Sequence, residues 1–190
     1  MQLKNLFFAA LIAAPMALFA QDYKVDVTHT NVGFSVKHLM ISTVRGNFGT
    51  FEGDFSLDPK SGVPSRMNAS IDVAAIDTGI VKRDDHLRSP DFFDVAKHPK
   101  MTFVMTGFKN GKVIGDLSIK GVKKSVELDY EFGGTAVDPW GNAKAGFVLS
   151  GQINRNDFAI TWNKALETGG VVVSDTVKLL IEVEGNGVKK

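Results

Sequence analysis

Apolar and polar residues alternate along most of this chain, and a period of two residues is typical of half-buried β-strands. The clearest case is a segment in which Val126, Leu128, Tyr130 and Phe132 share one face, with serine and acidic residues on the other. Strands of this kind bury their apolar faces only by stacking two sheets or by closing one sheet on itself. The pattern therefore predicts an all-β protein.

Short turn signals separate the alternating segments. Asn110-Gly111 fits the type I′ turn of a tight hairpin, Gly133-Gly134 is expected to end a strand, and residues 185–190 are expected to be a frayed tail. A change of phase near Gly49 predicts a β-bulge. About eight strands with hairpin-length links favour an antiparallel β-barrel built as a meander, with a β-sandwich as the alternative.

The alternation stops between residues 78 and 99. We expect Thr78 to cap a short helix from about Ile80 to Leu87, and Ser89-Pro90 to begin a second short helix that ends near Asp94. Leu87, Phe92 and Phe93 would then form an apolar cluster on this insert. A helical insert with three bulky apolar groups in an otherwise stranded chain is expected to plug or cover one end of a barrel.

The N-terminus has the pattern of a secretory signal peptide. Lys4 supplies the positive charge, residues 6–19 form an apolar run that contains Pro15, and Ala20 is a suitable residue before the cleavage point. We therefore predict a signal peptide at residues 1–20, a single domain at residues 21–190, and a periplasmic or secreted protein without a stable membrane span. A short uncleaved anchor is the alternative.

Charge and cysteine content exclude several classes of function. Lys and Arg number 22 and Asp and Glu 21, so no basic excess points to nucleic acid. Cysteine is absent, and the histidines at positions 29, 38, 86 and 98 lack the close spacing of a metal site. Neither a nucleophile elbow nor a zinc-protease motif is present. We expect no metal site, no cofactor and no catalytic residues.

Two interpretations of the barrel interior remain open. Aromatic and aliphatic residues on one face of a strand usually form a close-packed core. Gly115 and Gly151 share the inward phase, however, and remove side-chain volume there, while Met101 and Met105 supply flexible apolar surface beside them. These residues favour a lined cavity, in which a side chain added at Gly115 would point into open space.

Several spaced motifs together resemble the YceI-like family of lipid- and polyisoprenoid-binding proteins of bacterial periplasms. The motifs lie at residues 32–38, 46–48, 51–53, 83–94, 115–117, 121–124 and 154–158, with Pro99 and Phe103 beyond the fourth. The resemblance runs from Tyr23 to Val183, with Ala159 where the family tends to have glycine. It implies a lipocalin-like antiparallel β-barrel of about eight strands with a short helical insert, a long apolar tunnel for an amphiphilic chain, often a homodimer, and no established catalytic activity.

The function that we expect is binding, transport or storage of a long-chain amphiphilic lipid, such as a polyisoprenoid, an isoprenoid quinone, or a fatty acid or amide. Alternatives are a non-catalytic partner of a membrane redox protein, or an enzyme that acts on an isoprenoid lipid. The expected tunnel-lining residues are Phe34, Val36, Phe48, Leu87, Phe92, Phe93, Met101, Phe103, Met105, Gly115, Leu117, Ile119, Tyr130, Phe147, Leu149 and Ile153. The candidates for contact with the lipid head group are His38, Arg45 and Arg155.

Overall fold

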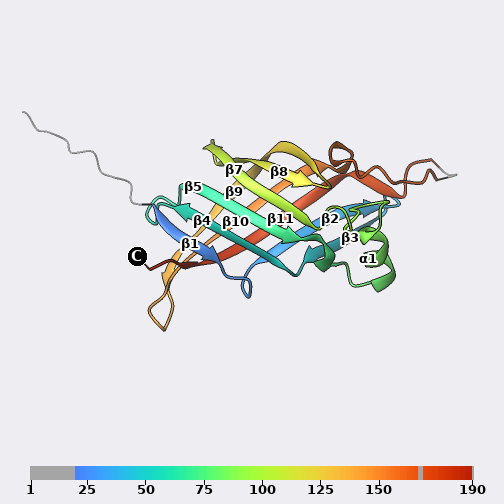
Figure 1. Ribbon diagram of the computed structural model, residues 1–190. Helices are drawn as coiled ribbons and strands as arrows, with labels where there is room; N and C mark the ends of the chain where they lie inside the picture. Colours follow the sequence, from blue (N-terminus) through green and yellow to red (C-terminus); the bar gives the residue numbers. More distant parts are fainter. Residues whose placement is uncertain (1–19, 167–168, 190) are drawn as a thin grey trace, which may run out of the picture.

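A computed structural model describes residues 20–166 and 169–189, so the predicted signal peptide lies outside the described residues apart from Ala20. The chain forms an elongated barrel with one α-helix at one end (Figure 1). The helical elements are η1 Val73–Ala75, α1 Val81–Arg88 and η2 Arg155–Phe158. The strands are β1 Gln21–Val25, β2 Asn31–His38, β3 Ser42–Phe48, β4 Phe51–Leu57, β5 Pro64–Asp72, β6 Ile76–Asp77, β7 Lys100–Lys109, β8 Lys112–Ile119, β9 Val122–Val137, β10 Ala143–Asn154 and β11 Val173–Gly187.

Eight of the described strands close into an antiparallel barrel, which confirms the predicted fold class. Their order is β1-β4-β5-β7-β8-β9-β10-β11, and a further pairing between β1 and β11 closes the ring. The hairpin of β2 and β3 continues the sheet from β11, and the short β6 pairs with β3. The barrel is therefore a meander from β4 to β11, with β1 inserted between its two ends.

The last strand, β11, holds two different partners along one edge. Its first part pairs with β2, from Val173 opposite His38 to Glu182 opposite Asn31. Its end pairs with β1, where Gly185 lies opposite Val25. The prediction that residues 185–190 are a frayed tail was therefore wrong for the segment as far as Gly187, because this segment closes the barrel.

The structure differs from the sequence prediction at Gly49 and at Gly133-Gly134. The phase change at Gly49 is not a bulge: β3 ends at Phe48 and β4 begins at Phe51, and the two strands pair with different neighbours. The Gly49 amide donates to the Ala75 carbonyl at 3.0 Å, which holds the link between β3 and β4 in place. Gly133-Gly134 does not end a strand, because β9 continues to Val137 with a shift of register at this point.

The insert forms one helix rather than two. Ser89 is the C-cap of α1, and its amide donates to the His86 carbonyl, so residues 89–98 follow as turns. Thr78 does not cap the helix either: both its amide and its hydroxyl donate to the carboxylate of Asp84, which is buried inside the helix's first turn. No helix within residues 20–166 and 169–189 is long and apolar enough to cross a bilayer.

The interior divides into two apolar clusters along the barrel axis. The cluster farther from α1, which we call the packed half, comprises Tyr23, Phe55, Leu57, Met67, Phe103, Val113, Leu128, Ala145, Phe147 and Leu149. The other includes Phe48, Ile71, Met101, Phe158 and Ile160 and lies against the insert that follows α1. In the packed half, aromatic rings lie directly on glycines: a Cβ on Gly185 would come within 2.5 Å of the Phe55 ring. Such close approaches leave the packed half without room for a guest molecule.

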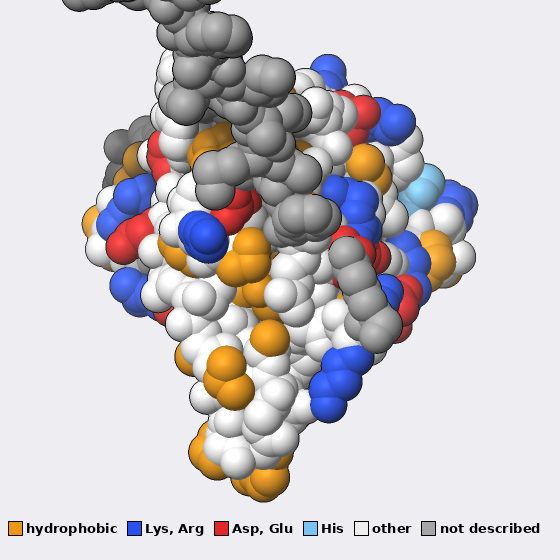
Figure 2. All heavy atoms as spheres, turned by 90° about the vertical axis from the view of Figure 1, so that its left-hand side faces the viewer, with side chains coloured by type: hydrophobic (Ala, Val, Ile, Leu, Met, Phe, Trp, Pro, Cys, Tyr) orange, Lys and Arg blue, Asp and Glu red, His pale blue; other side chains and the backbone are white. Residues whose placement is uncertain are grey.

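The end of the barrel opposite α1 carries a projecting hairpin between β9 and β10. Figure 2 looks onto this end and shows hydrophobic side chains gathered at its lower tip. Trp140 and Val137 are 83% and 73% exposed there, while the Asp138 carboxylate accepts hydrogen bonds from the Trp140 and Asn142 amides. These contacts fix the hairpin loop, and the exposed Trp140 and Val137 side chains belong to the hairpin.

Gly115 provides a test of close packing in the packed half. A Cβ on Gly115 would meet the Phe103 ring at 2.3 Å and the Val104 carbonyl at 2.8 Å. We expect Gly115→Ala to lower the free energy of unfolding by about 1–3 kcal/mol, because the added methyl overpacks the site. The matched control is Gly107→Ala on the paired strand, where a Cβ would meet nothing within 4 Å. Equal stability of the two variants in urea unfolding would contradict the close packing.

Candidate functional site

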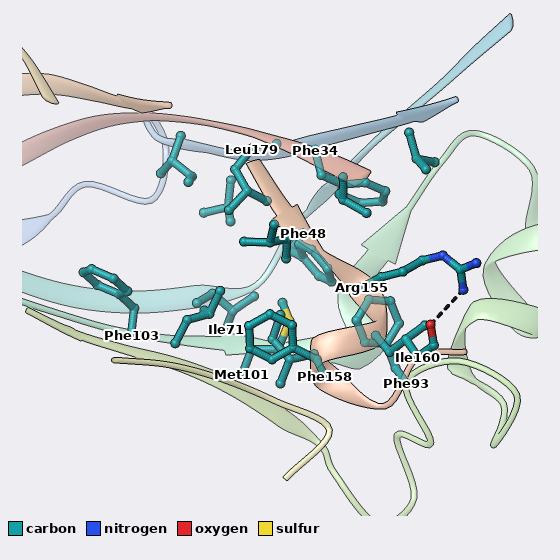
Figure 3. A pocket seen from close by; sticks show the side chains of 18 of the residues that line it. Phe34, Phe48, Ile71, Phe93, Met101, Phe103, Arg155, Phe158, Ile160 and Leu179 are labelled. Carbon is teal, nitrogen blue, oxygen red and sulfur yellow. Dashed lines mark hydrogen bonds between the residues drawn. The ribbon is translucent and has the colours of Figure 1, made fainter. Parts of the chain in front are cut away.

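The half of the barrel next to α1 contains a cavity of about 210 Å³. Figure 3 shows its side chains converging from the strands and from η2, with Phe103 at one end and Arg155 and Ile160 at the other. The cavity is lined by Val32, Gly33, Phe34, Val36, Phe48, Ala69, Ile71, Leu87, Phe92, Phe93, Met101, Phe103, Leu117, Ile119, Leu128, Leu149, Ile153, Arg155, Phe158, Ile160, Val173, Val177, Leu179 and Ile181. Among these residues, Arg155 alone has a polar side chain.

The cavity ends at the same level on neighbouring strands. On β7 the lining includes Phe103, whereas Met105, two residues further and on the same face, packs into the other half. On β8 it includes Leu117 but not Gly115, which pairs with Met105. Because residues two apart share a face, these positions mark a boundary that crosses the barrel interior.

Most of the residues expected to line a tunnel lie around this cavity. These are Phe34, Val36, Phe48, Leu87, Phe92, Phe93, Met101, Phe103, Leu117, Ile119, Leu149 and Ile153. The structure places the other four, Met105, Gly115, Tyr130 and Phe147, in or around the packed half instead. They have the inward phase, but phase does not say how far along the barrel the open space extends. Contact of any of these residues with a lipid stays a prediction.

The expectation that Gly115 faces open space was wrong, because the Phe103 ring covers it. Tyr130 is also part of the close packing: its hydroxyl donates to the Gly62 carbonyl at 2.7 Å, and its ring lies 5.4 Å from that of Phe147. Burial raises the pKa of Tyr130 to about 12. Both residues stabilise the packed half of the barrel.

Sequence reasoning missed a large part of the lining. The missed residues are Val32, Gly33, Ala69, Ile71, Leu128, Phe158, Ile160, Val173, Val177, Leu179 and Ile181. Some of those on strands carried a usable signal, since residues 177–183 alternate in the sequence apart from Leu180. Phe158 and Ile160 carried none, because the short η2 and the residues after it have no strand or helix periodicity.

The insert covers the α1 end of the cavity, as expected for a plug. Phe92 is 7% exposed, and Phe93 packs edge-on against Phe48 with ring centres 6.1 Å apart. His86 on α1 lies 5.0 Å from the rings of both Phe92 and Trp162, so it joins the insert to the segment after η2. Its Nε2 is 2.9 Å from the Asp91 carboxylate. Aromatic contacts thus hold this cover in place.

Arg155 is a clamp and not a free head-group contact. Its side chain is buried, and its guanidinium makes five hydrogen bonds within the protein. The shortest reach the carbonyls of Ile160 at 2.7 Å and Trp162 at 2.8 Å, and another reaches the Asp175 carboxylate at 3.1 Å. A guanidinium has five N–H groups, so no donor is left over for a ligand. Burial lowers the pKa of Arg155 from its usual value, and Asp175 opposes that effect.

The other two head-group candidates are not among the residues that line the cavity. Arg45 pairs with Ser35 across β2 and β3, on the face opposite to Phe34, and lines a separate surface groove of about 380 Å³. His38 ends β2 opposite Ser42 and Val173 and is not part of the cavity wall. The structure therefore does not bring the three candidates together, because the alternation of β3 directs Arg45 outward.

A carboxylate and histidine cluster lies outside the cavity. Asp26, His29 and Glu184 are close enough to hold a metal ion, but the Lys144 ammonium lies 2.9 Å from both Asp26 and Glu184. The hydrogen bond from the Thr28 hydroxyl, followed by that from Lys144, lowers the pKa of Asp26 well below its usual range. The cluster is consequently an ion-pair network that links β10, β11 and the turn after β1.

Loss of the Arg155 clamp is expected to be costly. Arg155→Met leaves buried carbonyl groups without donors, so we expect the free energy of unfolding to fall by about 3 kcal/mol or more in urea titrations. Arg155→Lys should recover only part of this loss, because an ammonium lacks the planar fork. Asp175→Asn serves as the control, with a loss below about 1 kcal/mol because the Asp175 side chain is 54% exposed. Native-like stability of Arg155→Met would refute the clamp.

The Asp26 network predicts a specific pH dependence of stability. Because the pKa of Asp26 is lowered on folding, its stabilising contribution is present above its unfolded pKa of about 3.9 and is lost as the pH falls below it. We expect Asp26→Asn to melt below the wild type at neutral pH, with a difference that shrinks in acid. Asp157→Asn removes a carboxylate at an exposed position outside the network and serves as the control. A constant difference between Asp26→Asn and wild type from neutral to acid pH would rule the linkage out.

The chain is similar to known proteins over most of its length. A model of the YceI-like domain matches residues 23–185. Protein YceI of Escherichia coli O17:K52:H18 is 38% identical over 189 residues, which cover 96% of each chain. The crystal structure of a Campylobacter jejuni YCEI protein has a TM-score of 0.71 and 39% identity, and the match covers 86% of this chain and 96% of that one.

A more distant structure shares the fold alone. It is a polyisoprenoid binding domain from Saccharophagus degradans, with 16% identity, a TM-score of 0.62, and coverage of 87% of this chain and 98% of that one. The match to the domain model, together with 38% identity over nearly the whole length of an E. coli relative, decides the family. The chain belongs to the YceI-like family.

Proposed function

We propose that this protein binds the apolar chain of an amphiphilic lipid in the cavity next to α1. The observation that carries the proposal is the cavity itself. Its wall is aliphatic and aromatic apart from Arg155, whose guanidinium is hydrogen-bonded within the protein. The likeness to a polyisoprenoid binding domain supports the same class of ligand. A polyisoprenoid, an isoprenoid quinone, or a fatty acid or amide each has a chain of this kind.

The energetics favour a chain of substantial length. Burial of one methylene contributes about 0.8 kcal/mol, whereas association costs roughly 4–15 kcal/mol. A chain of about ten buried carbons therefore only begins to offset that cost. Because the side chains of the wall offer no free donor or acceptor, the cavity selects a ligand by the length and width of its chain and not by its functional groups. The polar head group therefore lies outside the cavity.

The biological role that we propose is transport or storage of such a lipid in the periplasm or outside the cell. The charge, apolar run and Ala20 at the N-terminus support export. We propose no catalytic step, since the lining residues named above include no carboxylate, histidine or hydroxyl side chain near the proposed chain. A homodimer remains part of the proposal, to be tested by sedimentation of the exported protein.

Mass spectrometry of an organic extract from the purified protein tests the proposal directly. We expect a lipid with a long apolar chain to copurify at a substantial fraction of the protein concentration. Protein stripped of lipid should then take up added fatty acid or isoprenoid quinone. Absence of both a copurifying lipid and any uptake would end the proposal.

Filling the cavity should exclude the ligand. Ala69 lines the cavity and pairs with Phe103, so Ala69→Phe places a ring in the space of the chain. We expect lipid affinity to fall by roughly tenfold or more, the equivalent of about two lost methylenes. Val104→Phe introduces the same ring on an adjacent strand but at a position 48% exposed, and should bind normally. Calorimetric titration with palmitic acid compares the two, and equal affinities would exclude the cavity as the site.

A further inference from the structure

The cavity occupies only one half of the barrel, and its inner end is well defined. On two strands, the last lining residue is followed two positions further, on the same face, by a residue that belongs to the packed half alone: Phe103 by Met105 on β7, and Leu149 by Phe147 on β10. These positions form a floor that separates the cavity from the packed half. The floor limits how far into the barrel a guest in the cavity can extend.

Phe103 is the central residue of the floor. It belongs both to the cavity wall and to the packed cluster, and it is 8% exposed. Its ring lies across Gly115 on the paired strand, with Cζ only 2.3 Å from the place a Cβ would occupy. Figure 3 shows this ring at the end of the cavity remote from Arg155. A planar ring seated on a bare backbone closes the space beneath it.

We propose that Phe103 sets the maximum length of chain that the cavity accepts. The inference rests on the proposed function and adds to it a limit on the ligand. The lining on β11 runs from Val173 to Ile181, roughly 26 Å at about 3.3 Å per residue. With a strand tilt of about 35–45°, this corresponds to about 20 Å along the barrel axis.

That depth identifies the class of chain. One leaflet of a bilayer core is about 15 Å deep, so a cavity about 20 Å deep is long enough for a single membrane acyl chain or an isoprenoid of similar length. Longer polyisoprenoids leave their remaining units outside the barrel. Replacement of Phe103 by a small residue lengthens the site, because Gly115 beneath the ring has no side chain with which to fill the space.

Titration calorimetry with saturated fatty acids from decanoic to tetracosanoic acid tests the limit. In the wild type, we expect affinity to rise roughly fourfold for each added methylene and then to stop rising at a limiting length. In Phe103→Ala, the rise continues for two or more further methylenes, so that the longest acids bind about 15-fold more tightly than to the wild type. Phe103→Leu, which retains more of the core, should show a smaller shift in the same direction and serves if Phe103→Ala does not fold.

Met105→Ala is the matched control. It removes a large side chain from the same strand, two residues below the floor and outside the cavity wall, and should keep the limiting length of the wild type. The same limiting length in folded Phe103 variants and in wild type would overturn the role of Phe103 while leaving lipid binding intact. Failure of every acid to bind to folded wild type would instead overturn the proposed function, and the length limit with it.

Discussion

Backbone pairing along β11 is the constraint on which the rest of the molecule depends. One edge of this strand pairs with β2 over most of its length and with β1 at its end, while the other edge pairs with β10. A chain without cysteine has no covalent link to close a barrel, so these hydrogen bonds remove the free edges instead. Gly185 makes the closure possible, because a side chain there would collide with the Phe55 ring. The packed half lies at this closed end of the barrel, and the cavity lies at the other end.

The division into a packed half and a hollow half connects stability with function. Rings seated on glycines give the packed half an interior that accepts no added atom, and this rigid half supports the cavity wall. At the other end, the insert after α1 and the segment after η2 cover the cavity through the His86, Phe92 and Trp162 contacts. Arg155 ties that segment to the start of β11 through backbone carbonyls. The cover is therefore anchored to the strand that closes the barrel.

Two polar residues in the sequence motifs, Asp84 and Arg155, turn out to be structural. Asp84, in the first turn of α1, accepts a hydrogen bond from the Thr78 amide. Arg155, in the motif at residues 154–158, donates hydrogen bonds to backbone carbonyls. The position of Arg155 in a conspicuous motif predicts a ligand contact, but its donors are all used within the protein. The cavity wall is instead made of ordinary apolar residues such as Leu179 and Ile181, whose only sequence signal is alternation. For a site that recognises an apolar chain, the informative residues are the ones that look like core.

Alternation and turn chemistry in the sequence determined the all-β class, the approximate number of barrel strands, the hairpin at Asn110-Gly111 and about half of the residues of the cavity wall, because strand periodicity is a local property. Tertiary structure alone decided that Phe48 and Phe51 belong to strands with different partners, that Gly185 closes the barrel, and that residues 89–98 form turns. It alone also decided where the open space ends. Phe103 and Met105 have the same phase on one strand, and only the Phe103 ring lying across Gly115 on the neighbouring strand separates cavity from core. Contacts between strands depend on register and axial position, which the pattern within one strand does not contain.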